Sequence, residues 1–467
     1  MKNTRATSSS AAPARWVALL VAVTFFMENL DATAIVTALP QMARDFSVTA
    51  VELNVGISAY LLAVALFIPL SGWLADRFGA RRVFAAAIVL FTLASVMCGF
   101  SDSLAFFTFS RVLQGIGGAL MVPVGRLVVL RVTEKQDLVR MIAFITWPGL
   151  VAPILGPPLG GLMVSYGHWQ WIFWLNIPLG IAALLGTFCL IPGGMVSNQR
   201  PFDLRGFILT ALACAALISG LEWLGRGLLW SGGAVVAGGL LSGWLSFRHG
   251  RRHATPMLPV GAFAIASFRS TLVGGSLFRA SINAIPFLLP LLFQVSFGLS
   301  AASAGLLVLW VFAGNLAMKP FTTVIMRRWG FRQVLVVNGA ISVAAILVCA
   351  LLTPALAYPW LALILFIGGM SRSMQFTCYN TLGFADVPKA QMSEASTLFS
   401  MFFQLSMSIG VAFAALVLRA AMSFHANPQP QITDFGWAFV AVAALALLAL
   451  LDALRLKPGV GEHVLQP

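Results

Sequence analysis

The chain has 467 residues, of which 59% are hydrophobic and only 9% charged, and its mean hydropathy is +0.91. These values exclude an ordinary soluble domain and are typical of a polytopic membrane protein. A net charge of +14 would suggest nucleic-acid binding in a soluble protein, but the positions of the basic residues indicate another origin.

The first predicted membrane span follows a short basic tail. The apolar run from Trp16 to Leu39 is too long for the core of a signal peptide, and it lacks a convincing cleavage site. Similar runs recur along the chain. Fourteen spans are predicted, near 16–39, 53–75, 83–100, 104–130, 141–165, 171–191, 206–223, 228–247, 271–293, 302–326, 333–353, 360–383, 396–418 and 436–454.

Two long polar connections, 192–205 and 248–270, bracket spans seven and eight. They predict a helix pair inserted between two six-span halves. The predicted division is a tail at 1–15, a six-span half at 16–191, the inserted pair with its loops at 192–270, a second half at 271–454, and a tail at 455–467.

Most Lys and Arg residues fall in alternate connections and in the two tails. This is the positive-inside pattern, so we expect both termini in the cytoplasm and a plasma membrane location, in bacteria the inner membrane. The net positive charge is then explained by membrane topology, and nucleic acid is not an expected partner. The expected partners are the lipid bilayer, a small-molecule substrate and protons; protein partners are not indicated.

Cysteine and histidine patterns predict no cofactor. The five cysteines lie in apolar runs and are interpreted as small core residues. His249 and His253 are close together in a basic loop and could form a metal pair. Because no further ligand stands near them in the sequence, a solvated basic loop is the preferred interpretation, and no metal site is predicted.

An internal repeat supports two parallel halves. The stretch Asp76-Arg77-Phe78-Gly79-Ala80-Arg81-Arg82-Val83 follows span two, and Arg327-Arg328-Trp329-Gly330-Phe331-Arg332-Gln333-Val334 follows span ten. Two six-helix halves in parallel are the architecture of major facilitator transporters.

The first copy of the repeat, together with Gly72, which lies four residues before Asp76, resembles the signature loop of that superfamily. Asp76 beside Arg77, Arg81 and Arg82 could form charge pairs that open and close a cytoplasmic gate. A simple positive-inside anchor is the alternative, but it explains neither Asp76 nor Gly72 and Gly79. The second copy departs, with Arg327 where Asp76 stands and Thr323 where Gly72 stands.

Arg111 lies inside span four, in Arg111-Val112-Leu113-Gln114-Gly115-Ile116-Gly117-Gly118-Ala119, which resembles the superfamily's fourth-helix motif. A charge within a span indicates function, because it is costly unpaired in hydrocarbon. Asp31 is its expected partner. At 1.5 Å per residue, the two lie about 22 Å and about 20 Å from the inner edge.

Leu30-Asp31-Ala32-Thr33-Ala34-Ile35-Val36-Thr37-Ala38-Leu39-Pro40 resembles the first-helix motif of fourteen-span drug:proton antiporters, the EmrB/QacA type. A carboxylate balanced between burial and a nearby arginine could take and release a proton. Glu28, one turn earlier on the same face, could join it or contact substrate. The alternative is a permanent Asp31–Arg111 ion pair that only fixes span one to span four.

Span five contains Gly149-Leu150-Val151-Ala152-Pro153-Ile154-Leu155-Gly156-Pro157-Pro158-Leu159-Gly160-Gly161, which is similar to the antiporter motif of that family, with Ala152 where a glycine is usual. Prolines remove backbone donors and glycines permit close helix packing, so the run predicts a kinked pivot. The motif residues are Gly149, Pro153, Gly156, Pro157, Gly160 and Gly161.

The second half contains Arg279 and Arg372 within spans, about 12 Å and about 15 Å from the inner edge, and no acid near the centre of a span. They could bind an anionic substrate, or be satisfied by backbone carbonyls and water.

The predicted fold is therefore an all-α polytopic membrane protein with the major facilitator fold. The predicted function is proton-coupled export of drugs or toxic amphiphiles by alternating access. Export of an organic anion through Arg279 and Arg372 is the alternative, and an uncoupled facilitator is a weaker one. An enzyme is not predicted, since neither a nucleotide-binding glycine loop nor a metal-ligand spacing occurs.

Overall fold

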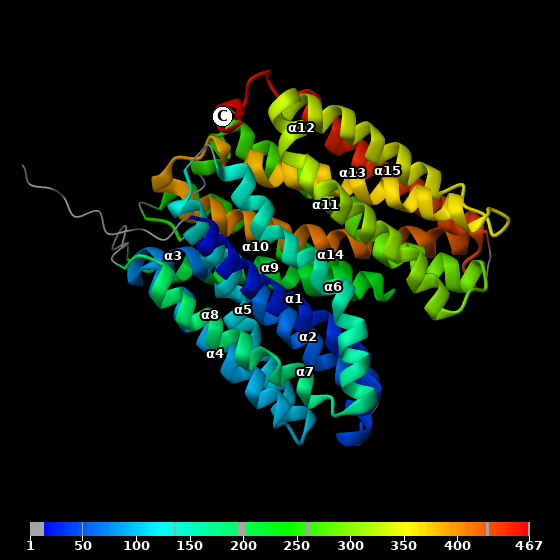
Figure 1. The fold of residues 1–467 in the computed structure, drawn as a ribbon, viewed down its shortest axis with the longest axis horizontal. Coiled ribbons are helices and arrows are strands. Elements are labelled where there is room, and N and C mark those ends of the chain that lie inside the picture. Colours follow the sequence, from blue (N-terminus) through cyan, green and yellow to red (C-terminus); the bar gives the residue numbers. More distant parts are fainter. Residues whose placement is uncertain are drawn as a thin grey trace, which may run out of the picture. The chain divides into compact units, whose positions relative to one another are not determined.

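A computed structural model describes residues 14–48, 50–134, 137–193, 201–253, 255–257, 261–425 and 429–465. Within these residues the regular structure is helical, as predicted, and Figure 1 shows the helices. The first ten α-helices are α1 (Ala14–Asp45), α2 (Ala50–Phe67), α3 (Leu70–Phe78), α4 (Ala80–Gly99), α5 (Leu104–Val132), α6 (Leu138–Tyr166), α7 (Gln170–Trp174), α8 (Asn176–Leu190), α9 (Leu204–Gly225) and α10 (Leu229–Arg252).

The remaining α-helices are α11 (Ala266–Leu291), α12 (Ala301–Cys349), α13 (Tyr358–Ala385), α14 (Met392–Phe424) and α15 (Ile432–Leu454). Short helical turns separate or end them. These are η2 (Gly261–Ala264), η3 (Leu292–Ser296), η4 (Lys389–Gln391) and η5 (Glu462–Val464).

The chain divides into two compact units. Unit 1 comprises Met1–Tyr60, Ser71–Thr133 and Phe144–Arg200, and unit 2 comprises Leu61–Leu70, Glu134–Ala143 and Pro201–Pro467. The helices predicted as an inserted pair, α9 and α10, group with unit 2. The five-part division of the chain stays a prediction.

In unit 1, α4 and α5 form an antiparallel pair, and α8 and α1 pack beside it. Small residues allow this close approach. A Cβ at Gly117 of α5 would lie 2.8 Å from the backbone nitrogen of Phe91 in α4, closer than atoms can pack. Ser103 caps α5 by accepting a hydrogen bond from the Phe106 N–H.

In unit 2, α11, α13, α14 and α15 pack with α12 into a bundle whose core is aliphatic and aromatic. The α9–α10 pair lies against α14 through α9. Two prolines, Pro286 and Pro290, lie within the last turns of α11, and the chain continues in the π-helical turn η3. A π turn changes the pairing of backbone groups, so it can provide donors for carbonyls that prolines leave without one.

The predicted sequence repeat corresponds to a repeated backbone turn. Gly79 separates α3 from α4 with φ 88°, and Gly330 interrupts α12 with φ 72° and ψ 166°. Positive φ values favour glycine, because glycine lacks a Cβ. The 49-residue α12 is thus two helices meeting at Gly330, which matches the predicted boundary between spans ten and eleven.

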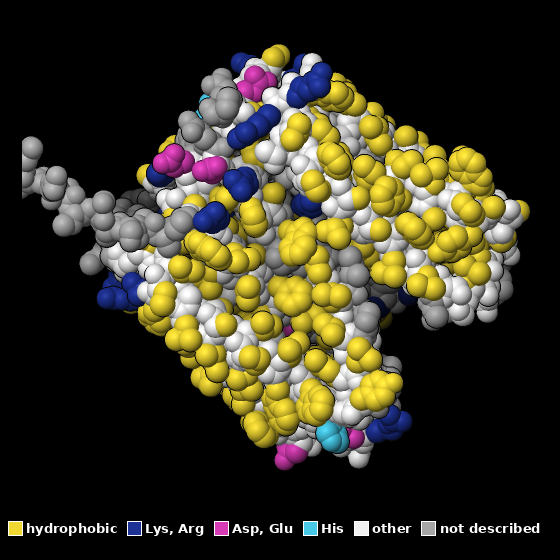
Figure 2. All heavy atoms as spheres, in the orientation of Figure 1, with side chains coloured by type: hydrophobic (Ala, Val, Ile, Leu, Met, Phe, Trp, Pro, Cys, Tyr) yellow, Lys and Arg dark blue, Asp and Glu magenta, His cyan; other side chains and the backbone are white. Residues whose placement is uncertain are grey.

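Ten described helices are long and apolar enough to cross a membrane, or eleven if α2 and α3, bent by 57°, count as one span. Exposed large apolar side chains cover the helices, as Figure 2 shows, with Leu93, Leu185, Leu240 and Val324 as examples. The chain is a multi-pass membrane protein. Each of the fourteen predicted runs overlaps described helix, but the number fourteen stays a prediction.

Candidate functional site

The buried centre of unit 1 contains the predicted Asp31–Arg111 pair. Arg111 Nη1 lies 2.7 Å from Asp31 Oδ2, and each side chain is 1% exposed. Gln114 and Asn176 also donate to Asp31 Oδ1, at 3.1 and 3.0 Å. Ser95 accepts from both amides, at 2.8 and 3.2 Å. Three side-chain donors therefore converge on one buried carboxylate.

Arg111 is further stabilised by aromatic rings. Its guanidinium carbon lies 4.4 Å from the centroid of Tyr60 and 6.0 Å from that of Phe173. Cation–π contacts of this kind strengthen when they are desolvated. Removing either charge of such a buried pair leaves the other uncompensated, at a cost of about 3–5 kcal/mol.

Glu28 lies one turn before Asp31 in α1 and has a different environment. Tyr60 donates to Glu28 Oε1 at 3.1 Å, while Oε2 is buried and has no hydrogen-bond partner among the described residues. Gly118 provides the space, since a Cβ there would lie 3.2 Å from Glu28 Oε1. Of the two acids, Glu28 therefore has the oxygen that a proton or a ligand could still occupy.

The glycines of the fifth predicted span pack against the same helix that contains Asp31. A Cβ at Gly156 would overlap Thr33 Oγ1, and one at Gly160 would overlap Thr37 Oγ1, whereas one at Gly161 would meet nothing within 4 Å. Gly156 and Gly160 thus allow α6 to approach α1 closely.

The helix α6 is continuous in the described backbone. The side-chain surroundings of Gly149, Pro153 and Pro157 lie outside the described residues, so the kink expected from the prolines stays a prediction.

At the predicted gate, Asp76 pairs with a residue that the sequence analysis missed. Arg131, in the last turn of α5, donates from Nη2 to Asp76 Oδ1 at 2.8 Å. Of the basic residues expected beside Asp76, Arg81 instead donates to the Phe188 carbonyl at 2.8 Å. Arg82 is exposed. The sequence feature that could have indicated Arg131 is its position at the inner end of span four. It is 55 residues from Asp76 in the chain.

The other gate residues surround the turn. The Arg77 guanidinium lies 5.5 Å from the ring centroid of Trp73, the residue after Gly72. Gly79 supplies the positive φ between α3 and α4. The loop is therefore an ordered turn in which one acid–base pair links α3 to α5.

In unit 2, Arg279 is enclosed by aromatic and polar groups. Its side chain is buried, and its guanidinium carbon lies 4.6 Å from the centroid of Phe399 and 5.5 Å from that of Phe403. Longer contacts of 3.5 Å run to the Thr271 carbonyl and to Asn380 Oδ1. The described contacts thus surround the guanidinium with two aromatic rings and two oxygen acceptors.

Arg372 lines a small apolar cavity of about 40 Å³ between α11, α12 and α13. Its Nη1 is buried and has no hydrogen-bond partner among the described residues. Aliphatic side chains form most of the walls, among them Ile282, Ile346 and Leu365. Such a cavity could accept an apolar group with a negatively charged end.

Beside this cavity lies an uncharged network that links α12 to α13. Asn338 donates to Gln375 Oε1 and to the Ser371 carbonyl, both at 2.9 Å, and Ser342 and Ser371 are joined by a 2.6 Å hydrogen bond. Lys319, the other intramembrane base of this unit, donates to Thr377 Oγ1 at 3.0 Å.

The sequence profile of the Major Facilitator Superfamily matches residues 21–411. The chain belongs to the major facilitator superfamily. It is 39% identical over 461 residues to the putative multidrug resistance protein MdtD of Klebsiella pneumoniae (strain 342), with 97% of each chain covered. Identity to the protein of that name in Salmonella typhimurium (strain LT2) is 36% over 442 residues, with 93% of each chain covered.

Solved structures share the fold. The human organic anion transporter MFSD10 (TETRAN) gives a TM-score of 0.70 at 16% identity, covering 94% of this chain and 99% of that one. The proton:xylose symporter XylE, bound to 6-bromo-6-deoxy-D-glucose, gives a TM-score of 0.64 at 15% identity, covering 94% of each chain. The chain is therefore a secondary transporter with the major facilitator fold.

Proposed function

We propose that the protein is a proton-coupled antiporter of the EmrB/QacA type that exports drugs or other amphiphilic small molecules by alternating access. Both termini face the cytoplasm of a bacterial cell, and the protein lies in the inner membrane. The names of the MdtD relatives support the substrate class, and the placement of Lys and Arg supports the orientation.

The observation that carries the proposal is the buried acid site of α1. Asp31 is paired with Arg111 at 2.7 Å, and Glu28 has a buried oxygen with no described partner. A proton that enters from outside binds Glu28 first. Its transfer to Asp31 weakens the bond to Arg111 and releases α1 from α5.

The glycines of α6 allow the released helix to move. Gly156 and Gly160 present no side chain to α1, so α1 can shift against α6 with little steric resistance. At the cytoplasmic ends, opening requires the Asp76–Arg131 pair to separate. Proton loss to the cytoplasm restores the Asp31–Arg111 pair and resets the transporter.

Transport of ethidium into inverted membrane vesicles, driven by a proton gradient, tests this mechanism. Asp31→Asn should abolish uphill transport while ethidium binding to purified protein is largely retained. Glu28→Gln should also impair uphill transport, because it removes the first proton acceptor. Full uphill activity of the Asp31→Asn variant would remove Asp31 from the mechanism.

A second candidate function is export of an organic anion. The supporting observation is the buried Nη1 of Arg372 in a cavity with apolar walls. Taurocholate, an amphiphilic anion, and ethidium, a cation, are suitable probes. If the anion is the cargo, Arg372→Gln and Arg279→Gln should each reduce taurocholate transport and leave ethidium transport unchanged; unchanged taurocholate transport would exclude this function.

An uncoupled facilitator would move substrate without moving protons. In vesicles with an imposed pH gradient, ethidium should partly dissipate the gradient only when active protein is present. Transport without dissipation would favour the facilitator.

A further inference from the structure

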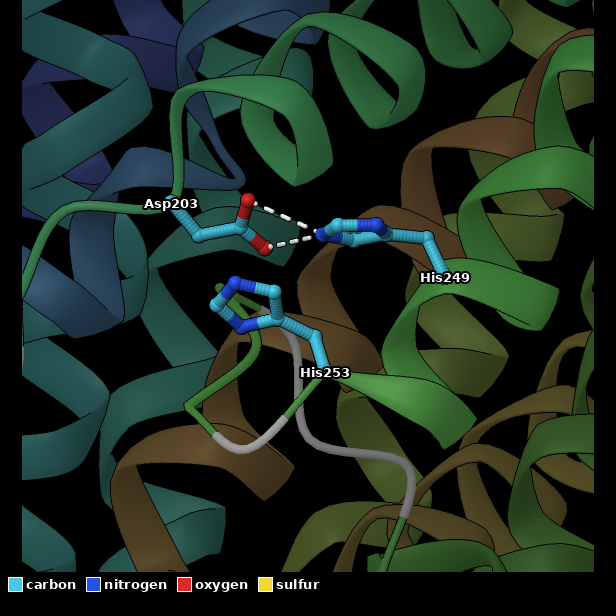
Figure 3. A group of neighbouring side chains, drawn as sticks. All are labelled: Asp203, His249 and His253. Carbon is cyan, nitrogen blue, oxygen red and sulfur yellow. Dashed lines mark hydrogen bonds and ion pairs between the residues drawn. The ribbon is translucent and has the colours of Figure 1, made fainter.

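The inserted helix pair brings together three side chains that could bind a metal ion. Asp203 is the N-cap residue of α9, His249 lies in the last turn of α10, and His253 is the residue that ends α10. Because the helices are antiparallel, the fold supplies the third ligand that the histidine pair lacks nearby in the sequence. Figure 3 shows the two imidazoles on adjacent sides of one carboxylate.

The ligand atoms are close enough for one ion. His249 Nε2 lies 3.0 and 2.8 Å from the two oxygens of Asp203, and one ligand atom from each of the three residues lies within 4.8 Å of the others. Zinc binds imidazole nitrogen and carboxylate oxygen at about 2.0–2.2 Å. Ligand atoms around such an ion are about 3.5 Å apart, so small side-chain rotations would complete the site.

Backbone donors fix the carboxylate in place. The N–H groups of Gly206 and Met257 donate to Asp203 Oδ1 and Oδ2, at 2.9 and 3.1 Å. The carboxylate is therefore held in a fixed orientation, and hydrogen bonds of this kind support metal ligands in proteins.

The histidines leave one side of the site open. The ring centroids of His249 and His253 are 4.9 Å apart, and the rings are nearly parallel. The His253 side chain is exposed, with one ring nitrogen toward the carboxylate (Figure 3). Binding through that nitrogen transfers the ring proton to Nδ1, which then gives up its 3.3 Å contact with the Thr255 N–H.

Some charges around the site favour the binding of a cation, and others oppose it. The carbonyl end of α10 favours a cation, whereas Arg248, Arg251 and Arg252, in the same last turns of α10, oppose one. Two imidazoles exclude the hard ions Mg²⁺ and Ca²⁺, which require oxygen ligands. One carboxylate and two imidazoles suit Zn²⁺, Co²⁺ or Ni²⁺, with water in the open position.

We propose that Asp203, His249 and His253 bind a divalent transition-metal ion of the zinc type, which joins the start of α9 to the end of α10. This site is independent of the proposed transport mechanism. Metal binding stabilises the helix pair, since an ion that binds only the folded pair favours it by mass action.

The test uses full-length protein in detergent, purified without a polyhistidine tag. Zn²⁺ binding is measured by calorimetry, and Co²⁺ binding by its visible absorption. We expect one ion per chain and a metal-dependent rise in the unfolding temperature. His253→Ala should weaken binding at least about tenfold and remove the thermal shift, because even groups that support a ligand contribute about 10–100-fold.

His253 is the best residue to change, because Asp203 and His249 also pair with each other and Asp203 caps α9. His168→Ala removes an exposed histidine from unit 1 and is the matched control; it should bind Zn²⁺ like the wild type. His249→Gln is the second ligand variant and should also weaken binding. No binding to wild-type protein at 1 mM Zn²⁺, or equal binding by His253→Ala, would overturn the proposal.

Discussion

Each unit contains a buried polar network between packed helices, and the two networks are centred on different groups. In unit 1, Asp31 accepts from Arg111, Gln114 and Asn176. In unit 2, the network of Asn338 and Gln375 with Ser371 is built from amides and hydroxyls. Since proton transfer requires a titratable group, this difference supports the proposal that proton coupling lies in unit 1.

The largest expected effect comes from leaving the Asp31 charge unpaired. Arg111→Gln should lower the free energy of unfolding by about 3–5 kcal/mol, measured as a loss of thermal stability in detergent. The double variant Asp31→Asn with Arg111→Gln should recover most of this loss, because it leaves no unpaired charge. An unaffected single variant would mean that the pair is not a fixed buried contact.

The second-largest expected effect is a loss of transport on changing the contact between α1 and α6. Gly156→Leu or Gly160→Leu should reduce ethidium transport at least about tenfold, since overpacking costs about 1–3 kcal/mol. Gly161→Leu is the matched control because a side chain there meets nothing within 4 Å. Equal activity of all three variants would show that close packing on α1 is not required.

A smaller effect is expected at the predicted gate. Arg131→Gln should change transport several-fold, because the Asp76–Arg131 pair is only partly buried, with 10% and 18% of the side chains exposed. Arg82→Gln, which removes an exposed charge, should have less effect. A double-mutant cycle with Asp76→Asn measures the coupling, and strict additivity would contradict a direct role for the pair.

The smallest effect on coupling is expected in unit 2. Asn338→Leu and Gln375→Leu together should leave the number of protons moved per ethidium unchanged, although stability and transport rate can fall. Vesicle measurements of proton and ethidium fluxes give this ratio. A changed ratio would place part of the coupling in unit 2.

Much of this arrangement follows from the sequence. The sequence repeat, which indicated two parallel halves, coincides with two backbone turns, in which Gly79 and Gly330 both take a positive φ. Matching depths in the membrane predicted the contact between Asp31 and Arg111, because a charge within hydrocarbon must find its partner at the same level.

Other contacts had no usable signal. Gln114 stands in the fourth-helix motif, but it and Asn176 are neutral amides 83 and 145 residues from Asp31. An amide, unlike a charge within hydrocarbon, does not by itself require a partner at the same depth. The Asp203–His249 contact likewise joins residues that are far apart in the chain. Such contacts depend on how helices pack, which hydrophobic periodicity does not determine.

Proton release on cargo binding tests the central claim most directly. Purified protein in weak buffer with a pH indicator is mixed with ethidium, or with taurocholate if that anion is transported. The wild type and the unit 2 double variant should release protons, whereas a Glu28→Gln, Asp31→Asn double variant that still binds the probe should release none. Equal release from that variant would contradict a proton site in unit 1.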